Sequence, residues 1–185
     1  MTKTKTHRMV QTALIGALYT ALTLAMAPFS FGTVQFRISE ALVLLPLFSP
    51  AGIWGVTFGC FFSNILGFLL GTNPLGIVDA FVGTTATLIG AVLTRLIGRW
   101  FSGEEKRSRI IGMLLAPVPP VIMNALLVGM ELAVVFGGKP GESFGAIFVF
   151  QAASVALGEV IVLYTFGMLL CGVLRRNDLY KKLFR

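Results

Sequence analysis

Carboxylic acids and amides interrupt the long apolar stretches of this sequence, and they are the residues best suited to chemistry. They are Glu40, Asp79, Glu131 and Glu159, with Asn64, Asn124 and Gln151. A carboxylate can accept two parallel N–H bonds from an amidine- or guanidine-like edge, and an amide can bind a nearby oxygen or ring nitrogen. Such a set suits a ligand with several N–H donors or a positive charge, for example a guanine-type base.

The spacing of these residues places two pairs on shared helix faces. Asn124 and Glu131 are seven residues apart, two helical turns, so they project from one face. Gln151 and Glu159 are eight residues apart, which separates them by only about 80° around a helix. Ionisable groups at membrane depth are costly and by default mark function. Any one of these residues can instead join neighbouring helices, but the set as a whole predicts one interior site.

Other kinds of site find little support in the sequence. His7 is the only histidine, which excludes a histidine-based metal site or triad, and Cys60 and Cys171 lie in different apolar stretches with no zinc or disulfide spacing. Residues 141–145 match the nucleophile elbow G-x-S-x-G, but no strand precedes them. The chain carries no Walker A sequence that could bind ATP. We therefore predict no enzyme activity, and no metal or cofactor on this chain.

The composition shows which elements must position the polar residues. Of 185 residues, 56% are hydrophobic and 12% are charged, about half the charged share of a soluble domain. The mean hydropathy is +0.86. A bilayer-spanning helix needs about 20 apolar residues, so the chain has room for roughly six. This composition excludes a water-soluble enzyme, a disordered chain and, despite the formal net charge of +7, a nucleic-acid-binding domain.

The predicted fold class is an all-α integral membrane protein with six transmembrane helices in one domain, residues 1–185. Pro46 and Pro50 shorten the second span, and Pro117, Pro119 and Pro120 predict a kink or a broken start in the fifth. The predicted spans are about residues 9–29, 39–49, 51–70, 75–97, 110–136 and 144–174.

The basic residues predict the orientation of these spans. With the N-terminus in the cytoplasm, of the 15 Lys and Arg residues only Arg37 and Lys139 fall outside. An even number of spans then places both termini in the cytoplasm. In this orientation none of the seven acids and amides named above lies in the inner half of the membrane. The sequence thus predicts a polar basin that opens outward and is closed toward the cytoplasm.

The loop between the first two predicted spans lies over this basin. Its Phe29, Phe31 and Phe36 can stack on a flat ring, or they can anchor helix ends at the membrane interface. Arg37 can neutralise one of the acids, or it can pair with Glu40 and hold the loop in place.

Small residues form a ridge along the first span. Ala13, Ala17, Ala21 and Ala25 recur every four residues, and this spacing lets another helix approach closely. Internal packing and docking of a partner protein are both open. Because none of these seven acids and amides lies in the first span, we predict that its role differs from theirs.

Five motifs in the same order resemble the QueT family, over roughly residues 10 to 172. This family comprises the substrate-binding S components of energy-coupling-factor (ECF) transporters for queuosine precursors. The motifs are VQFRISEAL at 34–42, GCFFSNILG at 59–67, DAFVGTTAT at 79–87, NALLVGME at 124–131 and ALGE at 156–159.

The resemblance implies a six-helix S component in the bacterial plasma membrane that captures a 7-deazaguanine base such as preQ0, preQ1 or queuine. Its partners would be the lipid bilayer, a transmembrane coupling subunit and two ECF ATPases that bind ATP and Mg. The coupling subunit would contact Ala13, Ala17 and Ala21. From residue type and position in the spans, we predict that the substrate-binding residues come from Glu131, Glu159, Asp79, Asn124, Asn64, Gln151, Glu40, Arg37 and Phe36.

Three alternatives stay open. The same scaffold can carry another vitamin-like molecule, a solitary carrier can be driven by protons through Glu159, and a membrane-embedded enzyme can use Glu131 and Glu159 as paired acids.

Overall fold

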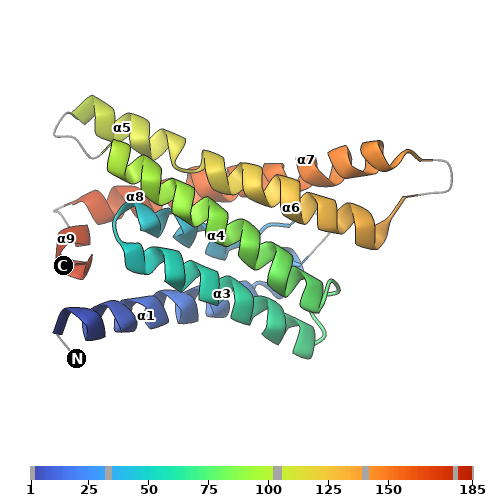
Figure 1. Ribbon diagram of the computed structural model, residues 1–185, viewed down its shortest axis with the longest axis horizontal. Helices are drawn as coiled ribbons and strands as arrows, with labels where there is room; N and C mark the ends of the chain where they lie inside the picture. Colours follow the sequence, from blue (N-terminus) through green and yellow to red (C-terminus); the bar gives the residue numbers. More distant parts are fainter. Residues whose placement is uncertain (1–2, 32–34, 102–105, 139–141, 177–178, 185) are drawn as a thin grey trace.

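The computed structural model describes residues 3–31, 35–101, 106–138, 142–176 and 179–184. Within these ranges the chain is helical, and the long helices run side by side along one bundle (Figure 1). Helix α1 begins and α9 ends at the same end of the bundle (Figure 1). The elements are α1 (Lys3–Ala25), α2 (Ala27–Ser30), η1 (Ile38–Leu47), α3 (Pro50–Leu69), α4 (Ile77–Trp100), α5 (Lys106–Leu115), α6 (Val118–Phe136), α7 (Phe144–Val162), η2 (Leu163–Gly167), α8 (Met168–Arg175) and α9 (Leu179–Phe184).

Four segments are long and apolar enough to cross a membrane, namely Pro50–Leu69, Ile77–Trp100, Arg107–Phe136 and Phe144–Arg175. Large apolar side chains face outward, with Trp100 77% and Phe150 71% exposed, whereas acids and amides are buried. This arrangement suits lipid surroundings and is that of a multi-pass membrane protein. The other two predicted spans, which correspond to α1 and η1, do not belong to these four.

The second predicted span differs most from the structure. It is a 3₁₀-helix whose residues from Ser39 to Leu47 are all buried. Ten residues of 3₁₀-helix rise about 20 Å, less than the roughly 30 Å of a bilayer core. Because η1 packs against α1, α3 and α4, it is an internal element that carries Glu40 into the bundle. Arg95 Nη1 donates to the carbonyls of Pro46 and Leu47, at 3.2 and 3.1 Å, and so caps its end.

The proline cluster breaks the fifth predicted span. Helix α5 ends at Leu115, and α6 begins at Val118. The carbonyl of Ala116 accepts a hydrogen bond from Thr94 Oγ1 at 3.0 Å, which compensates for a helical bond that the break removes.

Glycines let α1 and α3 pack closely. A Cβ on Gly55 would lie 2.6 Å from Ile15 Cβ, and one on Gly59 would lie 2.6 Å from Tyr19 Cβ. The side chains of Ile15 and Tyr19 therefore bury one face of α1 against α3, and the alanine ridge lies on a different, exposed face.

Candidate functional site

A buried ion pair between the first loop and α4 forms the centre of the candidate site. Arg37 Nη2 lies 3.5 Å from Asp79 Oδ2, and their side chains are 7% and 0% exposed. Asn73 Nδ2 donates to the same carboxylate oxygen at 2.9 Å, and Asn64 Nδ2 donates to the backbone carbonyl of Asp79 at 2.9 Å. A Cβ on Gly83 would lie 2.6 Å from Asp79 Oδ1, so the glycine leaves room for this carboxylate.

Glu40 binds to α1 and not to Arg37. The hydroxyl of Tyr19 donates to Glu40 Oε1. One turn farther along α1, the hydroxyl of Thr23 lies 2.6 Å from the hydroxyl of Ser39 in η1. Of the two alternatives for Arg37, pairing with Glu40 is therefore wrong, because among the described residues Arg37 forms its ion pair with Asp79. The first span does contribute to the polar interior, through a tyrosine and a threonine that the search for acids and amides passed over.

Cys60 of α3 joins the same cluster. Its Sγ accepts from Arg37 Nη1 at 3.8 Å and from Asn64 Nδ2 at 3.7 Å. Thiols are weak acceptors, so this residue packs between the polar groups and adds little charge. It is a free, buried cysteine.

Two further acids approach the cluster from α6 and α7. Asn124 Nδ2 donates to Glu159 Oε1 at 2.9 Å, which joins the two helices. Glu131 interacts electrostatically with Asp79 and Arg37, and Glu159 does so with Glu40 and Arg37. Electrostatic interactions thus connect acids of η1, α4, α6 and α7 with Arg37, and among the described residues Asp79 is the one within ion-pair distance of it.

Several acceptor oxygens in this cluster have no hydrogen-bond partner among the described residues. They are both carboxylate oxygens of Glu131, one each of Glu40, Asp79 and Glu159, and the amide oxygen of Asn64. Buried polar atoms are nearly always hydrogen-bonded, and an unpaired one is costly. Two nitrogens of Arg37, Nε and Nη2, also lack a hydrogen-bond partner there, but the unpaired acceptor oxygens outnumber them, which suits a ligand that supplies N–H groups or positive charge.

The cluster is closed to solvent in this structure. Glu40, Asp79, Glu131 and Glu159 are between 0% and 8% exposed, so the acids do not line an open basin. Residues of the first loop lie against two helices: Phe31 packs on Gly67 of α3, and the carbonyl of Gln35 approaches Gly158 of α7.

Gly158 should be required for this loop packing. A Cβ there would lie 2.0 Å from the carbonyl oxygen of Gln35, which is backbone and cannot rotate away. We expect Gly158→Ala to lower the free energy of unfolding by about 1–3 kcal/mol through overpacking. Thermal unfolding in detergent measures this loss of stability. Gly172→Ala is the matched control, because nothing lies within 4 Å of its Cβ position; an equal or larger loss there would contradict the packing argument.

Two of the predicted binding residues lie at the edge of this arrangement. Gln151 lines a cavity of about 680 Å³ with Glu142 and Phe136 near the α6–α7 connection, and no hydrogen bond joins it to Glu159 in the described part of the chain. Eight helical residues separate the two along the axis by about 12 Å. Phe36 is half-buried, and its backbone N–H donates to the carbonyl of Phe29 at 2.9 Å.

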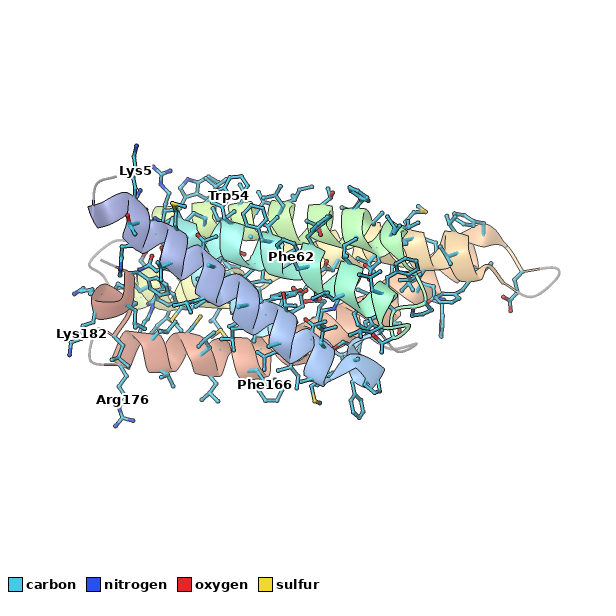
Figure 2. All side chains as sticks on the ribbon, turned by 90° about the horizontal axis from the view of Figure 1, so that it is seen from below. Lys5, Trp54, Phe62, Phe166, Arg176 and Lys182 are labelled. Carbon is cyan, nitrogen blue, oxygen red and sulfur yellow. The ribbon has the colours of Figure 1, made fainter. Side chains whose placement is uncertain are left out.

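A separate apolar groove runs between α1 and α3. Its volume is about 970 Å³, and it is lined by the predicted ridge residues Ala13, Ala17 and Ala21 together with Trp54 and Phe62. Figure 2 shows Trp54 and Phe62 along α3 beside α1. These three alanines are exposed, which argues against internal packing of the ridge.

Among the described residues no three metal-binding side chains come together.

Comparison with known proteins identifies the family. The QueT transporter family matches residues 9–176 of the chain. The queuosine precursor transporter QueT of Lactococcus lactis subsp. cremoris (strain MG1363) is 38% identical over 91 residues, which cover 48% of this chain and 50% of that protein. No solved structure matches the chain significantly. The family and this relative are transporters and not enzymes, in agreement with the prediction for this chain. The chain belongs to the QueT transporter family, as the resemblance predicted.

Proposed function

We propose that this chain is the substrate-binding S component of an ECF transporter and that it captures a queuosine precursor outside the cell. The substrate is a 7-deazaguanine base such as preQ0, preQ1 or queuine. The observation that supports this most is the set of buried acceptor oxygens on Glu131, Glu159, Glu40 and Asp79 beside one arginine. The family match and the name of the Lactococcus relative support the choice of ligand.

The geometry suggests a division of roles among these residues. Glu131 is the best placed to accept the N–H pair of the base, since both of its carboxylate oxygens lack a partner among the described residues. Asn124 fixes one oxygen of Glu159 and leaves the other available as a second acceptor. In this cluster the four carboxyl groups of Glu40, Asp79, Glu131 and Glu159 outnumber the one guanidinium of Arg37, which favours a ligand with N–H groups or an ammonium group.

Ligand entry requires movement of the first loop. Phe31 contacts Gly67 of α3, the Gln35 carbonyl approaches Gly158 of α7, and the acids are buried, so a ligand from outside has to displace these contacts. In the proposed orientation, with both termini cytoplasmic in the plasma membrane, this loop faces outward. Its phenylalanines then cover the ring of the bound base and exclude water.

The exposed ridge is the proposed contact with the coupling subunit. Ala13, Ala17 and Ala21 leave room for a helix of that subunit in the groove beside α3. Two ATPase subunits with ATP and Mg then supply the energy, since this chain has no nucleotide-binding sequence. Uptake of the base is measured in cells with and without the coexpressed ATPases. We expect uptake only when the ATPases are present, and uptake without them would contradict the proposal.

A large side chain on the ridge should separate assembly from binding. We expect Ala17→Trp to reduce co-purification with the coupling subunit at least about tenfold, because the indole fills the groove. Affinity for the base should not change, since Ala17 lies on a different face from Tyr19. Pull-down and calorimetry measure the two effects. Leu18→Trp is the control, because Leu18 is 50% exposed and does not line the groove; equal loss in both variants would refute the ridge as the docking surface.

A further inference from the structure

A small cavity with donor groups lies at the end of the bundle where α1 begins and α9 ends. Its volume is about 180 Å³, and the ends of η1, α4, α5, α8 and α9 surround it. Of the described side chains that line it, only Arg109, Arg175 and Tyr180 carry polar atoms, and all three can donate hydrogen bonds. A cavity whose polar side chains are all donors suits an oxyanion.

The guanidinium of Arg175 is held in place by uncharged groups. Its Nη1 donates to the backbone carbonyl of Arg109 at 3.4 Å, and its carbon lies 5.8 Å from the ring centroid of Phe48. Arg175 also interacts electrostatically with Arg109, a like charge. An anion between the two would reduce this repulsion, and a guanidinium can bind phosphate oxygens through two parallel N–H bonds.

Helix α9 completes the cavity by folding back onto the bundle. The ring of Tyr180 packs on Phe48, with centroids 5.3 Å apart, and Phe184 packs against the core. Gln11 Nε2 of α1 donates to the carbonyl of Leu183 and ties the helix down. The hydroxyl of Tyr180 is thereby positioned at the cavity by contacts that do not depend on a ligand.

The cavity lies at the level of the lipid headgroups. Arg175 is the last residue of one membrane-spanning segment, and Arg109 is close to the start of another, Arg107–Phe136. Figure 2 shows Lys5, Arg176 and Lys182 at this same end, so the surroundings are basic. Basic pockets between transmembrane helices at this level bind the phosphates of anionic lipids.

We propose that this cavity binds the phosphate of an anionic phospholipid, with Arg175 as its principal donor and Tyr180 as a second. The lipid bridges α8, α9 and α5 and holds the end of the bundle together. The cavity shares no lining residue with the groove between α1 and α3.

Native mass spectrometry of the full chain in neutral detergent tests the proposal, with phosphatidylglycerol and phosphatidylcholine as probes. We expect phosphatidylglycerol to bind about tenfold more tightly than phosphatidylcholine, and Arg175→Gln to remove this preference. The neighbouring Arg176→Gln is the matched control and should keep it, because Arg176 does not line the cavity. Equal loss in both variants, or no preference in the unmodified chain, would overturn the proposal.

Two further measurements complete the test. Tyr180→Phe keeps the ring on Phe48 but removes the hydroxyl, so it should weaken phosphatidylglycerol binding about threefold while the protein stays folded. This variant decides the question if Arg175→Gln does not fold, and unchanged binding in it would then count against the site. Inorganic phosphate is the last probe: binding as tight as that of phosphatidylglycerol would assign the cavity to soluble phosphate and reject the lipid.

Discussion

Replacing Glu131 with Gln should weaken binding of a 7-deazaguanine base about 10- to 100-fold. The carboxylate loses its charge and one of two acceptor positions, and hydrogen bonds to a charged group contribute about 1.5–3 kcal/mol. Glu131 is 5% exposed, and neither carboxylate oxygen has a partner in the described part of the chain, so the variant disturbs no described hydrogen bond. Isothermal calorimetry on the purified chain measures the change.

The control for this prediction is Glu142→Gln. Because Glu142 is exposed near the start of α7, the substitution should leave affinity for the base within about twofold of that of the unmodified chain. Glu159→Gln provides a second measurement. One carboxylate oxygen of Glu159 accepts a hydrogen bond from Asn124, and the other has no partner among the described residues. Unchanged affinity in both Glu131→Gln and Glu159→Gln would remove the role of carboxylates in binding.

Replacing Arg37 with Gln should destabilise the protein by about 3–5 kcal/mol, the usual cost of breaking a buried ion pair on one side. Arg37 is 7% exposed, and it is paired with a fully buried Asp79 and stacked 5.3 Å from the ring centroid of Phe31. Its loss removes the ion-pair partner that Asp79 has among the described residues. Thermal unfolding in detergent, compared with the exposed Arg176→Gln, measures the effect.

A double-mutant cycle separates charge from packing in that result. In the Arg37→Gln, Asp79→Asn variant no unpaired charge is left at the pair, so its destabilisation should be smaller than the sum of the two single variants by about 1–3 kcal/mol. Simple additivity of the two losses would mean that the ion pair is not coupled in the folded protein.

Much of the fold follows from the sequence, because length and apolar content set the positions of the long helices. The segment Phe144–Arg175 lies within one or two residues of the predicted sixth span, and the break before Val118 occurs where the prolines predict it. The 3₁₀ conformation of Ile38–Leu47 could not be predicted from the sequence. An apolar segment of ten residues looks the same whether it meets lipid or other helices, and only the packing around it decides.

The candidate site follows only in part. Residue type and helical spacing identify the four acids, which the structure buries, with Asp79 paired to Arg37. The roles of Tyr19 and Asn73 were missed, since one counts as an apolar residue of the first span and the other as a loop residue. A usable signal was available for the tyrosine, because a hydroxyl inside a membrane helix needs a partner. The choice of Asp79 as the partner of Arg37 depends on the path of the loop, which spacing does not fix.

The most direct measurement changes the ligand and leaves the protein intact. The unmodified chain is titrated by calorimetry with a 7-deazaguanine base and with the analogue that lacks the exocyclic amino group. If buried carboxylates accept the N–H pair, the analogue should bind at least about tenfold more weakly, since one charged hydrogen bond is lost. Equal affinity for the two bases, or no binding of either, would contradict the account.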